Sequence, residues 1–316
     1  MNLPVQFCGV TLANPLVLAS GVLGTQAELL VRVARRGAGA VTSKSCSLEP
    51  RAGHPNPTVL DWGAGLINAI GLSNPGVEAA VIELRRAQEQ LLALSAAEGR
   101  ARVPLIASVF SNSAQGFAAV AERVCAGGPD LVELNISCPN VQGEFGRPFA
   151  ADWRSAAAVT RAVRDVLSVP FIVKLSPNVP DIAEVARAVE DAGADAIAAV
   201  NTLGPGMLID IRSGAPMLAN RVGGVSGPAI HPIAVRCVYD VCGAVRIPVI
   251  GIGGVTSGRD ALEMVLAGAT AVGVGAAIHY RGLDAFRLIV REIEDLMAEC
   301  GYASLDDMRG LAHERP

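Results

Sequence analysis

The chain has 316 residues, a formal net charge of −4, a sequence pI near 5.6 and a mean hydropathy of +0.41. This charge balance gives no support for binding to nucleic acid or to an anionic membrane, since either partner would require a basic patch. No apolar run approaches the roughly 18 residues of a membrane helix, and the N-terminus lacks the pattern of a signal peptide. The seven cysteines are widely spaced without a Cys-x-x-Cys pair, which predicts a reduced, cytoplasmic protein without a zinc or iron–sulfur site.

Short, continuously apolar runs alternate with helical patterns along the chain, and eight of these runs are predicted to be strands. An apolar run without polar alternation is typical of a strand that is buried on both faces of a parallel sheet. The predicted strands are, in chain order, Leu16–Ala19, Ala40–Ser43, Leu105–Val109, Leu131–Ile136, Phe171–Leu175, Ala196–Val200, Pro248–Ile252 and Ala271–Val274.

A helical pattern follows each predicted strand, with apolar residues at intervals of three and four. The predicted helices are Gln26–Arg36, Val77–Ala97, Ala114–Ala126, Ala151–Leu167, Ile182–Ala192, Ile230–Cys242, Gly258–Ala267 and Gly282–Cys300. Two longer segments interrupt this alternation. Glu49–Gly76 follows the second strand and is expected to be a long loop, and Asn201–Gly227 follows the sixth strand and has room for a small hairpin.

Eight βα units without a break in composition predict an α/β fold, a (β/α)8 TIM barrel that spans residues 1–316 as a single domain. The alternative is a doubly wound open sheet. A Gly-x-Gly-x-x-Gly run after the first strand would favour that alternative. The residues there, Ala19-Ser20-Gly21-Val22-Leu23-Gly24, match that pattern poorly.

Lysine is rare in this chain, with Lys44 and Lys174 against 24 arginines. Both lysines end or closely follow a predicted strand, and active sites of α/β barrels lie at the carboxyl ends of the strands. Lys is a compact point charge on a thin stem, whereas Arg is a wide planar fork, so a narrow pocket can require Lys. The alternative is that two lysines simply survived a compositional bias.

Asparagines gather near the same strand ends, at Asn68, Asn135, Asn140 and Asn201. Each amide offers one acceptor and two donors in a plane, so several converging amides would suit a planar, amide-rich ligand such as a pyrimidine. The alternative is that each asparagine serves a turn.

Three glycine-rich loops lie near the last strands, at Gly223–Pro228, Gly251–Gly254 and Gly273–Ala276. Glycine lets backbone N–H groups approach an anion, and barrels often bind phosphate between the loops after strands seven and eight. These loops therefore predict a phosphate-bearing ligand, although each glycine alone is also an ordinary turn residue.

Cys138 is the best catalytic candidate among the cysteines, because it lies on a loop beside Pro139 and two asparagines. No His or Asp adjoins it in sequence, which does not favour a Cys-His protease. A thiol with the ordinary pKa of about 8.5 can act as a base at mildly alkaline pH. Of the four histidines, His54 is expected in a mobile loop, and His231, His279 and His313 at the surface or at helix starts.

The run Asn135-Ile136-Ser137-Cys138-Pro139-Asn140 resembles the active-site loop of class 1 dihydroorotate dehydrogenases. The runs Asn68-Ala69-Ile70-Gly71-Leu72, Lys174-Leu175-Ser176-Pro177-Asn178 and Asn201-Thr202 occur in the order of that family, and the resemblance extends through essentially the whole chain. The run that begins at Gly223 resembles the NAD-linked (1B) subtype more than the fumarate-using one. Class 2 enzymes have a serine at the base position and an N-terminal membrane helix, whereas this chain has Cys138 and no such helix.

The resemblance implies an FMN enzyme of pyrimidine biosynthesis that oxidises (S)-dihydroorotate to orotate. Cys138 would remove a proton from C5 while a hydride passes from C6 to flavin N5, and Lys174 would lie near the flavin N1–O2 edge. The implied substrate-binding residues are Lys44, Asn68, Ala69, Ile70, Gly71, Leu72, Asn135, Asn140, Asn201 and Thr202. The implied FMN-binding residues are Ala19, Ser20, Gly21, Lys44, Ser45, Ser108, Asn135, Lys174, Val200, Ser226, Gly227, Gly253, Gly254, Gly275 and Ala276.

Two positions depart from the family pattern. Ser108 stands where relatives often have Asn, and Ala276 where they often have Thr. Both changes bear on FMN affinity, since Ser replaces only one hydrogen bond of an amide and Ala lacks a hydroxyl.

The resemblance also implies an assembly, either a homodimer or a heterotetramer with a partner subunit that carries FAD and a [2Fe–2S] cluster and passes electrons to NAD⁺. A fumarate-using homodimeric enzyme and a dihydropyrimidine dehydrogenase-like flavin enzyme remain alternatives. From another class, a flavin-free barrel that binds phosphate as a scaffold remains open as well.

Overall fold

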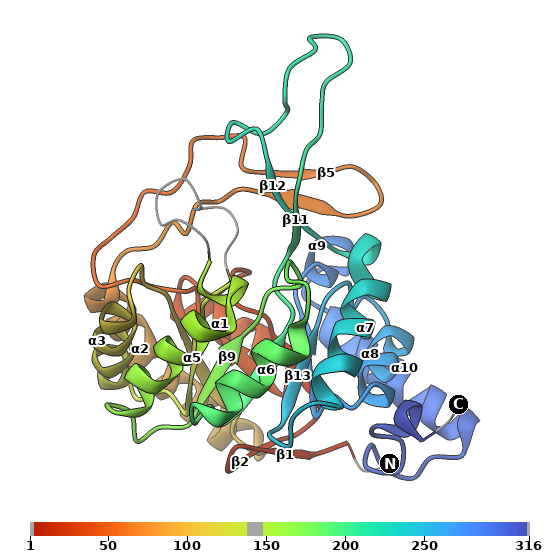
Figure 1. The fold of residues 1–316 in the computed structure, drawn as a ribbon. Coiled ribbons are helices and arrows are strands. Elements are labelled where there is room, and N and C mark those ends of the chain that lie inside the picture. The colour runs from red at the N-terminus through yellow and green to blue at the C-terminus, as the bar shows by residue number, and fades with distance from the viewer. Residues whose placement is uncertain (1–2, 138–147, 315–316) are drawn as a thin grey trace.

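Eight parallel strands close into a barrel in the computed structural model, which describes residues 3–137 and 148–314 (Figure 1). The strand order around the barrel is β10-β13-β14-β3-β4-β7-β8-β9. This confirms the predicted α/β barrel. The barrel strands are β3 (Leu16–Leu18), β4 (Ala40–Thr42), β7 (Leu105–Val109), β8 (Leu131–Asn135), β9 (Phe171–Lys174), β10 (Ala196–Ala199), β13 (Val249–Ile252) and β14 (Ala271–Val274).

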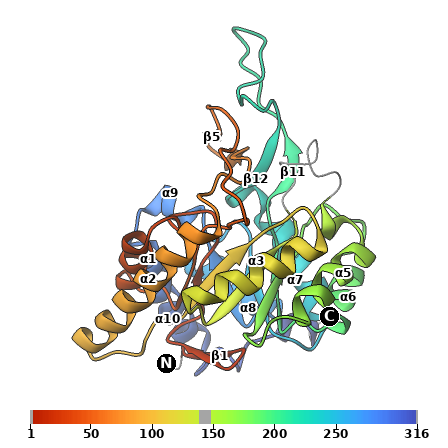
Figure 2. The same ribbon diagram turned by 90° about the vertical axis from the view of Figure 1, so that its left-hand side faces the viewer.

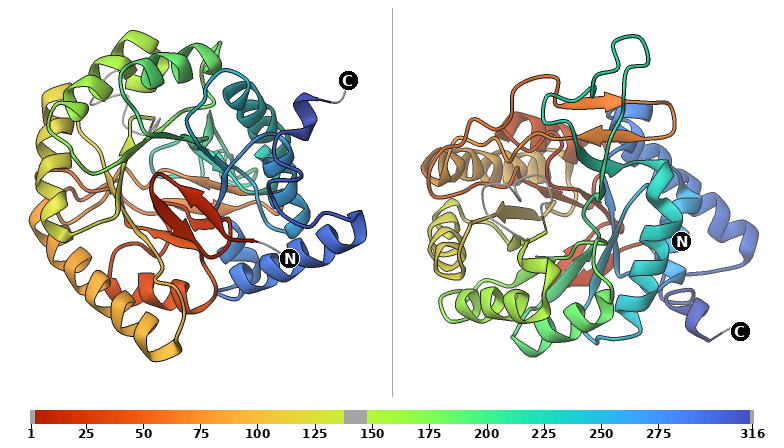
Figure 3. Two further views of the ribbon diagram at one scale, coloured as in Figure 1. Left: turned by 90° about the horizontal axis from the view of Figure 1, so that it is seen from below. Right: turned by 45° about the horizontal axis from the view of Figure 1, so that its top comes forward.

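Helices surround the barrel as an outer ring, which is clearest from below in the left view of Figure 3. They are α1 (Ala27–Arg35), α2 (Val77–Glu98), α3 (Ala114–Val124), α5 (Trp153–Arg164), α6 (Ile182–Asp191), α7 (His231–Cys242), α8 (Gly258–Leu266), α9 (Ala277–Arg281) and α10 (Ala285–Cys300). Short 3-10 turns are η1 (Cys125–Gly127), η3 (Phe149–Ala151), η4 (Pro228–Ile230) and η5 (Leu311–His313).

Two predicted helices begin two or three residues later than the sequence pattern suggested. The pattern over 282–300 is preceded by a separate short helix, α9, and α10 starts only at Ala285, because Gly282 at φ +68° ends α9. The pattern over 151–167 becomes helical only at Trp153. There the Asp152 side chain accepts a hydrogen bond from the Ser155 N–H at 3.1 Å and caps the helix.

The core lies between the barrel and the helix ring. Every residue of β7, β9, β10 and β14 is buried, as their continuous apolar pattern predicted. Phe117 of α3, Phe171 of β9 and Phe286 of α10 are among the largest fully buried side chains. Each such ring stabilises the fold by about 1.5–3 kcal/mol relative to an exposed side chain. The barrel is therefore a rigid support for residues at the strand ends.

A four-stranded antiparallel sheet stands above the carboxyl ends of the barrel strands (Figures 1 and 2). Its order is β11 (Leu203–Gly206), β12 (Gly223–Ser226), β6 (Leu66–Asn68) and β5 (Val59–Asp61). The hairpin expected after the sixth barrel strand is confirmed as β11–β12. The hairpin β5–β6 lies within the segment that was predicted to be a long loop. Three-residue strands are too short to show a period in sequence, which is why it was missed.

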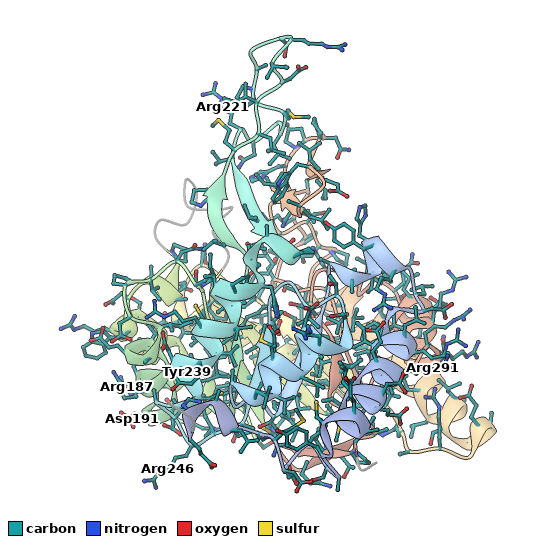
Figure 4. The ribbon with its side chains drawn as sticks, turned by 90° about the vertical axis from the view of Figure 1, so that its right-hand side faces the viewer. Arg187, Asp191, Arg221, Tyr239, Arg246 and Arg291 are labelled. Atoms are coloured by element: carbon teal, nitrogen blue, oxygen red, sulfur yellow. The ribbon has the colours of Figure 1, made fainter. Side chains whose placement is uncertain are left out.

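The residues between β11 and β12 project farthest from the barrel, and Arg221 lies on this projection (Figure 4). Tyr239 of α7 lies toward the opposite end of the molecule. Its ring stacks on His313, with centroids 3.9 Å apart, and so holds the C-terminal segment against α7.

The amino end of the barrel is covered by a second hairpin that the sequence did not predict, β1 (Val5–Phe7) with β2 (Val10–Leu12). Its turn residues Cys8 and Gly9 both have positive φ, +48° and +82°, and Cys8 is an unusual residue for that conformation.

In the described part of the chain, no helix has the length and apolar character needed to cross a membrane.

Candidate active site

A cavity of about 300 Å³ opens at the carboxyl ends of the barrel strands, where the four-stranded sheet contributes Asn68 and Ser226 to its wall. Small-molecule sites are commonly of this size. The cavity is lined by most of the residues singled out from the sequence, namely Ala19, Ser20, Gly21, Lys44, Ser45, Asn68, Ile70, Gly71, Leu72, Asn135, Lys174, Val200, Asn201, Thr202, Ser226, Gly227, Gly253, Gly254, Gly275 and Ala276.

Four of the singled-out residues are not among those lining the cavity. Ala69 is buried in a small apolar cluster with Ile67 and Leu218, on the opposite face of the chain from Asn68. Ser108 is fully buried below the cavity. Cys138 and Asn140 lie outside the described residues.

Lys174 ends β9 with its side chain almost fully buried, at 6% exposure. Its Nζ donates to Ser20 Oγ at 3.0 Å and lies 3.8 Å from Oε2 of Glu133, a buried carboxylate on β8. An unpaired buried ammonium would be costly, so the carboxylate lets a positive charge remain at the cavity floor.

The second lysine, Lys44, reaches the same cavity from the end of β4 and is half-buried. Its backbone N–H donates to the Gly24 carbonyl oxygen at 2.8 Å. A Cβ at Gly24 would come within 2.5 Å of the backbone nitrogen of Lys44, so this close approach of two strand-end loops requires glycine. Both lysines therefore line the same cavity.

Two asparagines and a serine meet at the ends of β8 and β10. Asn201 Nδ2 donates to Asn135 Oδ1 at 3.2 Å and to Ser137 Oγ at 2.9 Å. The Thr202 N–H donates to Asn201 Oδ1 at 2.8 Å. The ends of β8 and β10 thus supply side-chain amides that are already oriented by one another.

The run that follows β6 forms another part of the wall. Arg51 Nε donates to the Gly71 carbonyl oxygen at 2.7 Å, and the His54 N–H donates to the Ile70 carbonyl oxygen at 3.1 Å. The His54 ring nitrogen Nδ1 also lies 3.1 Å from the Ala69 carbonyl oxygen. His54, which was expected in a mobile loop, is one of the groups that hold this wall in place.

Comparison with known proteins gives a consistent result. The family model described as dihydroorotate dehydrogenase matches residues 2–297, a range that contains every residue lining the cavity. The chain belongs to the dihydroorotate dehydrogenase family.

Three archaeal proteins named dihydroorotate dehydrogenase B (NAD(+)), catalytic subunit, are similar over nearly their whole length. The protein of Methanothermobacter thermautotrophicus is 47% identical over 312 residues, covering 99% of this chain and 99% of that protein. The Pyrococcus furiosus protein is 42% identical over 314 residues, covering 99% and 100%. The Methanocaldococcus jannaschii protein is 41% identical over 312 residues, covering 99% and 98%.

The dihydroorotate dehydrogenase family uses a flavin, and the glycine loops of this family member suit a phosphate-bearing flavin. The N–H groups of Gly253, Gly254, Gly275 and Ala276 donate to no acceptor within the described residues. Gly254, at φ +70°, packs so closely that a Cβ there would lie 2.7 Å from the Gly227 carbonyl oxygen. These loops therefore present a cluster of donors with space only for glycine at Gly254.

Sequence reasoning missed two charged or polar groups of this site. Glu133 lies in the middle of a buried strand and not at a strand end; a carboxylate inside an apolar run was the available signal. His279 of α9 lines the cavity and lies with Nε2 2.8 Å from Asp61 Oδ2. His231 begins α7 as expected but is buried, with Nδ1 2.8 Å from the Gly253 carbonyl oxygen.

Three of the described thiols, all away from the cavity, are poorly suited to act as bases. Burial raises the pKa of Cys46 and of Cys242 to about 12. Burial, with a smaller contribution from the Asp195 charge, raises the pKa of Cys8 to about 12 as well.

Within the described ranges, no group of three or more His, Cys, Asp or Glu side chains is arranged to hold a metal ion.

Proposed function

We propose that this chain is the catalytic subunit of an NAD-linked dihydroorotate dehydrogenase, which oxidises (S)-dihydroorotate to orotate in pyrimidine biosynthesis. The observation that carries the proposal is the cavity itself. In a chain of this family, it joins buried Lys174 and the paired amides of Asn135 and Asn201 to backbone N–H groups with no acceptor among the described residues. Orotate and dihydroorotate are planar or nearly planar rings rich in amide groups, which such side chains can recognise.

The proposed cofactor is FMN. The chain is proposed to bind it as a single barrel domain. Ser226, Gly227 and the donors of the loops at 253–254 and 275–276 would hold its phosphate, and Ala19, Ser20, Gly21, Ser45 and Val200 would line its ring. Bound FMN supplies a two-electron acceptor for the hydride at C6 of the substrate. Lys174 would face the part of the ring where negative charge develops, and its charge stabilises that state. Ser108 does not line the cavity, but its hydroxyl group is hydrogen-bonded to that of Ser45.

The substrate is proposed to lie against the asparagines. Asn68, Asn135, Asn140 and Asn201, together with Thr202, would bind the pyrimidine ring and its carboxylate. Backbone groups of 69–72 would complete the contact, and Lys44 would touch both ligands. Thr202 is held against Gly224, where a Cβ would come within 2.1 Å of Thr202 Oγ1. Small residues here leave room for the threonine to approach the ring.

Cys138 is proposed as the general base that removes the C5 proton. It directly follows Ser137, whose hydroxyl oxygen accepts a hydrogen bond from Asn201 Nδ2. The base is thereby attached in sequence to a residue that is fixed to the substrate wall. Its role rests on the resemblance of its loop to the family's active-site loop.

The partner is proposed to be a subunit with FAD and a [2Fe–2S] cluster, which transfers electrons to NAD⁺. The words "catalytic subunit" in the relatives' names fit a protein with more than one kind of subunit. We propose a homodimer of this chain, alone or within a heterotetramer, located in the cytoplasm.

The function is tested by mixing the FMN-loaded protein with dihydroorotate in the absence of oxygen. The visible absorbance of the flavin should disappear with dihydroorotate and persist with dihydrouracil. Among NAD⁺ with the partner subunit, fumarate and a quinone, NAD⁺ should restore the colour. Bleaching by dihydrouracil would instead favour a dihydropyrimidine dehydrogenase-like enzyme. Protein that stays colourless after FMN is added would favour the scaffold alternative.

A further inference from the structure

Glu133 is a buried carboxylate that the proposed reaction does not use. It lies on β8 two residues before Asn135, so both side chains leave the strand on the same face. Its residue is only 3% exposed. Oε2 lies 3.8 Å from Lys174 Nζ, and Oε1 accepts a hydrogen bond from Ser108 Oγ at 2.9 Å. Since Lys174 has only donors, it occupies one carboxylate oxygen and leaves the other to Ser108.

A line of hydrogen bonds leads from this carboxylate to the substrate wall. Ser108 Oγ lies 2.8 Å from Ser45 Oγ, and Asn135 Nδ2 donates to Ser45 Oγ at 3.2 Å. An ionised carboxylate only accepts, and a serine hydroxyl has a single proton. Because Ser108 gives its proton to Glu133, Ser45 must donate to Ser108, and Asn135 must then present its NH₂ group to Ser45.

The direction of this line of hydrogen bonds fixes the orientation of the Asn135 amide beside Asn201. With Nδ2 of Asn135 committed to Ser45, Oδ1 faces Asn201 and accepts from Nδ2 at 3.2 Å. Oδ1 of Asn201 is held separately by the Thr202 N–H at 2.8 Å. Asn135 is therefore oriented through the line of hydrogen bonds that begins at Glu133. Asn201 is oriented by the backbone N–H of Thr202.

We propose that Glu133 is a positioning residue whose charge sets the orientation of the Asn135 amide, and with it the donor and acceptor pattern that this amide presents to the substrate ring beside Asn201. This inference deepens the proposed function and rests on it for the identity of the ring. The carboxylate acts through Ser108 and Ser45, at a distance from the substrate.

The substitution Glu133→Gln tests the idea because it keeps the size of the side chain. The glutamine carbonyl oxygen should face the ammonium of Lys174, which leaves its NH₂ group facing Ser108. The line then reverses, so that Ser108 donates to Ser45 and Ser45 donates to Asn135. Asn135 must turn its NH₂ group toward that of Asn201, which cannot turn in response because the Thr202 N–H holds its oxygen.

The first measurement follows the side-chain amide signals of Asn135 and Asn201 by ¹⁵N NMR in protein without ligands. We expect both signals to move in Glu133→Gln. Ser108→Ala breaks the line without altering the charge, so the Asn135 signals should move in that variant too. In the Ser108→Ala background, Glu133→Gln should add no further change at Asn201. Amide signals that remain in place in both single variants would overturn the inference, and Ser108→Ala still decides if Glu133→Gln does not fold.

The second measurement is calorimetric titration of orotate into the oxidised, FMN-loaded protein. Glu133→Gln should weaken orotate binding about tenfold or more, since two buried donors then face each other. In the Ser108→Ala background, Glu133→Gln should change the affinity for orotate less than about twofold, because Glu133 affects Asn135 only through an intact line of hydrogen bonds. Equal weakening in both backgrounds would show a charge effect instead and overturn the inference.

The two proposals fail in different ways. Wild-type protein that binds neither FMN nor orotate would contradict the proposed function, while the ligand-free amide signals would still decide the role of Glu133. Wild-type protein that binds both, with amide signals unaffected by either substitution, would contradict only the role of Glu133.

Discussion

His279 Nε2 lies 2.8 Å from Asp61 Oδ2, and this contact joins α9 to the β5–β6 hairpin beside the cavity. The hairpin contributes Val59, Leu66 and Asn68 to the cavity wall. We therefore expect Asp61→Ala to loosen the hairpin, with faster amide hydrogen exchange in residues 59–68 and a few-fold faster release of FMN. Hydrogen-exchange mass spectrometry and the rise of flavin fluorescence on dilution measure the two effects.

A matched control is Asp210→Ala on the β11–β12 projection. Asp61 accepts from the N–H of Gly63 and Asp210 from that of Arg212, each two residues ahead, so both substitutions remove the same kind of turn contact. Only Asp61 also contacts His279. If Asp210→Ala released FMN as fast as Asp61→Ala, the histidine contact would have no part in closing the cavity.

The same contact has a defined pH dependence. The Gly63 N–H, and secondly the His279 hydrogen bond, hold the pKa of Asp61 below its ordinary value of 3.8. A depressed pKa means that the stabilisation is complete above the ordinary value and is lost as the pH falls through the lower, folded-state value. The exchange rate of 59–68 should therefore stay constant from neutral to mildly acidic pH after correction for intrinsic exchange. A marked increase at mildly acidic pH would contradict this assignment.

The opposite charges of Lys174 and Glu133 compensate one another inside the barrel, where the two side chains are 6% and 4% exposed. Lys174→Met leaves the carboxylate buried without its cation, which typically lowers the free energy of unfolding by about 3–5 kcal/mol. Urea denaturation of the FMN-free protein measures this loss. The double variant Lys174→Met/Glu133→Gln should recover much of it. No recovery would mean that Lys174 stabilises the barrel through its packing and not through the charge pair.

The exposed pair Arg123–Glu78 provides the contrast for that experiment. Both side chains are more than half exposed, at 53% and 67%, so water screens their attraction. Arg123→Met should leave the urea midpoint almost unchanged.

The barrel was predictable because its evidence is local. Continuous apolar runs such as Leu105–Val109 and Ala271–Val274 became strands with the predicted bounds, and each was followed by a helix. The β1–β2 hairpin was not predictable in the same way. Its strands have three residues each and its turn uses Cys8 at φ +48° in place of the usual glycine or asparagine.

The candidate site was predictable where polar residues end a strand, as at Asn135 and Lys174. Their neighbourhood follows from barrel register, which pairs these two residues across β8 and β9. Glu133 was not found, because its significance depends on Ser108 and Lys174, which only the closed barrel brings to it. The roles of Cys138 and Asn140, which lie outside the described residues, stay predictions.

Two glycines of the cavity should respond differently to the same substitution. Gly254 has φ +70°, and a Cβ there would meet the Gly227 carbonyl oxygen and His231 Cβ, each at 2.7 Å. Gly254→Ala should therefore lower the free energy of unfolding by about 1–3 kcal/mol and weaken FMN retention. At Gly275 a Cβ meets Ala19 Cβ at 3.6 Å, an ordinary contact, so Gly275→Ala should leave stability unchanged. Equal destabilisation by both would contradict the steric argument.

Cys138→Ala should separate cofactor binding from proton removal. The variant should retain FMN but lose flavin bleaching by dihydroorotate, with a rate about 10²–10⁴-fold lower in anaerobic stopped flow, because a general base contributes that much. In the unsubstituted protein the rate should rise from neutral to mildly alkaline pH as a thiol loses its proton.

The control for that experiment is Cys242→Ala. Burial raises the pKa of Cys242 to about 12, so its thiol stays protonated over the same pH range and cannot produce the rise. Cys242→Ala should keep both the rate and its pH dependence. A normal bleaching rate in Cys138→Ala, or an alkaline rise that survives in its residual rate, would remove Cys138 from the reaction. Loss of FMN in Cys138→Ala would instead assign this residue to cofactor binding.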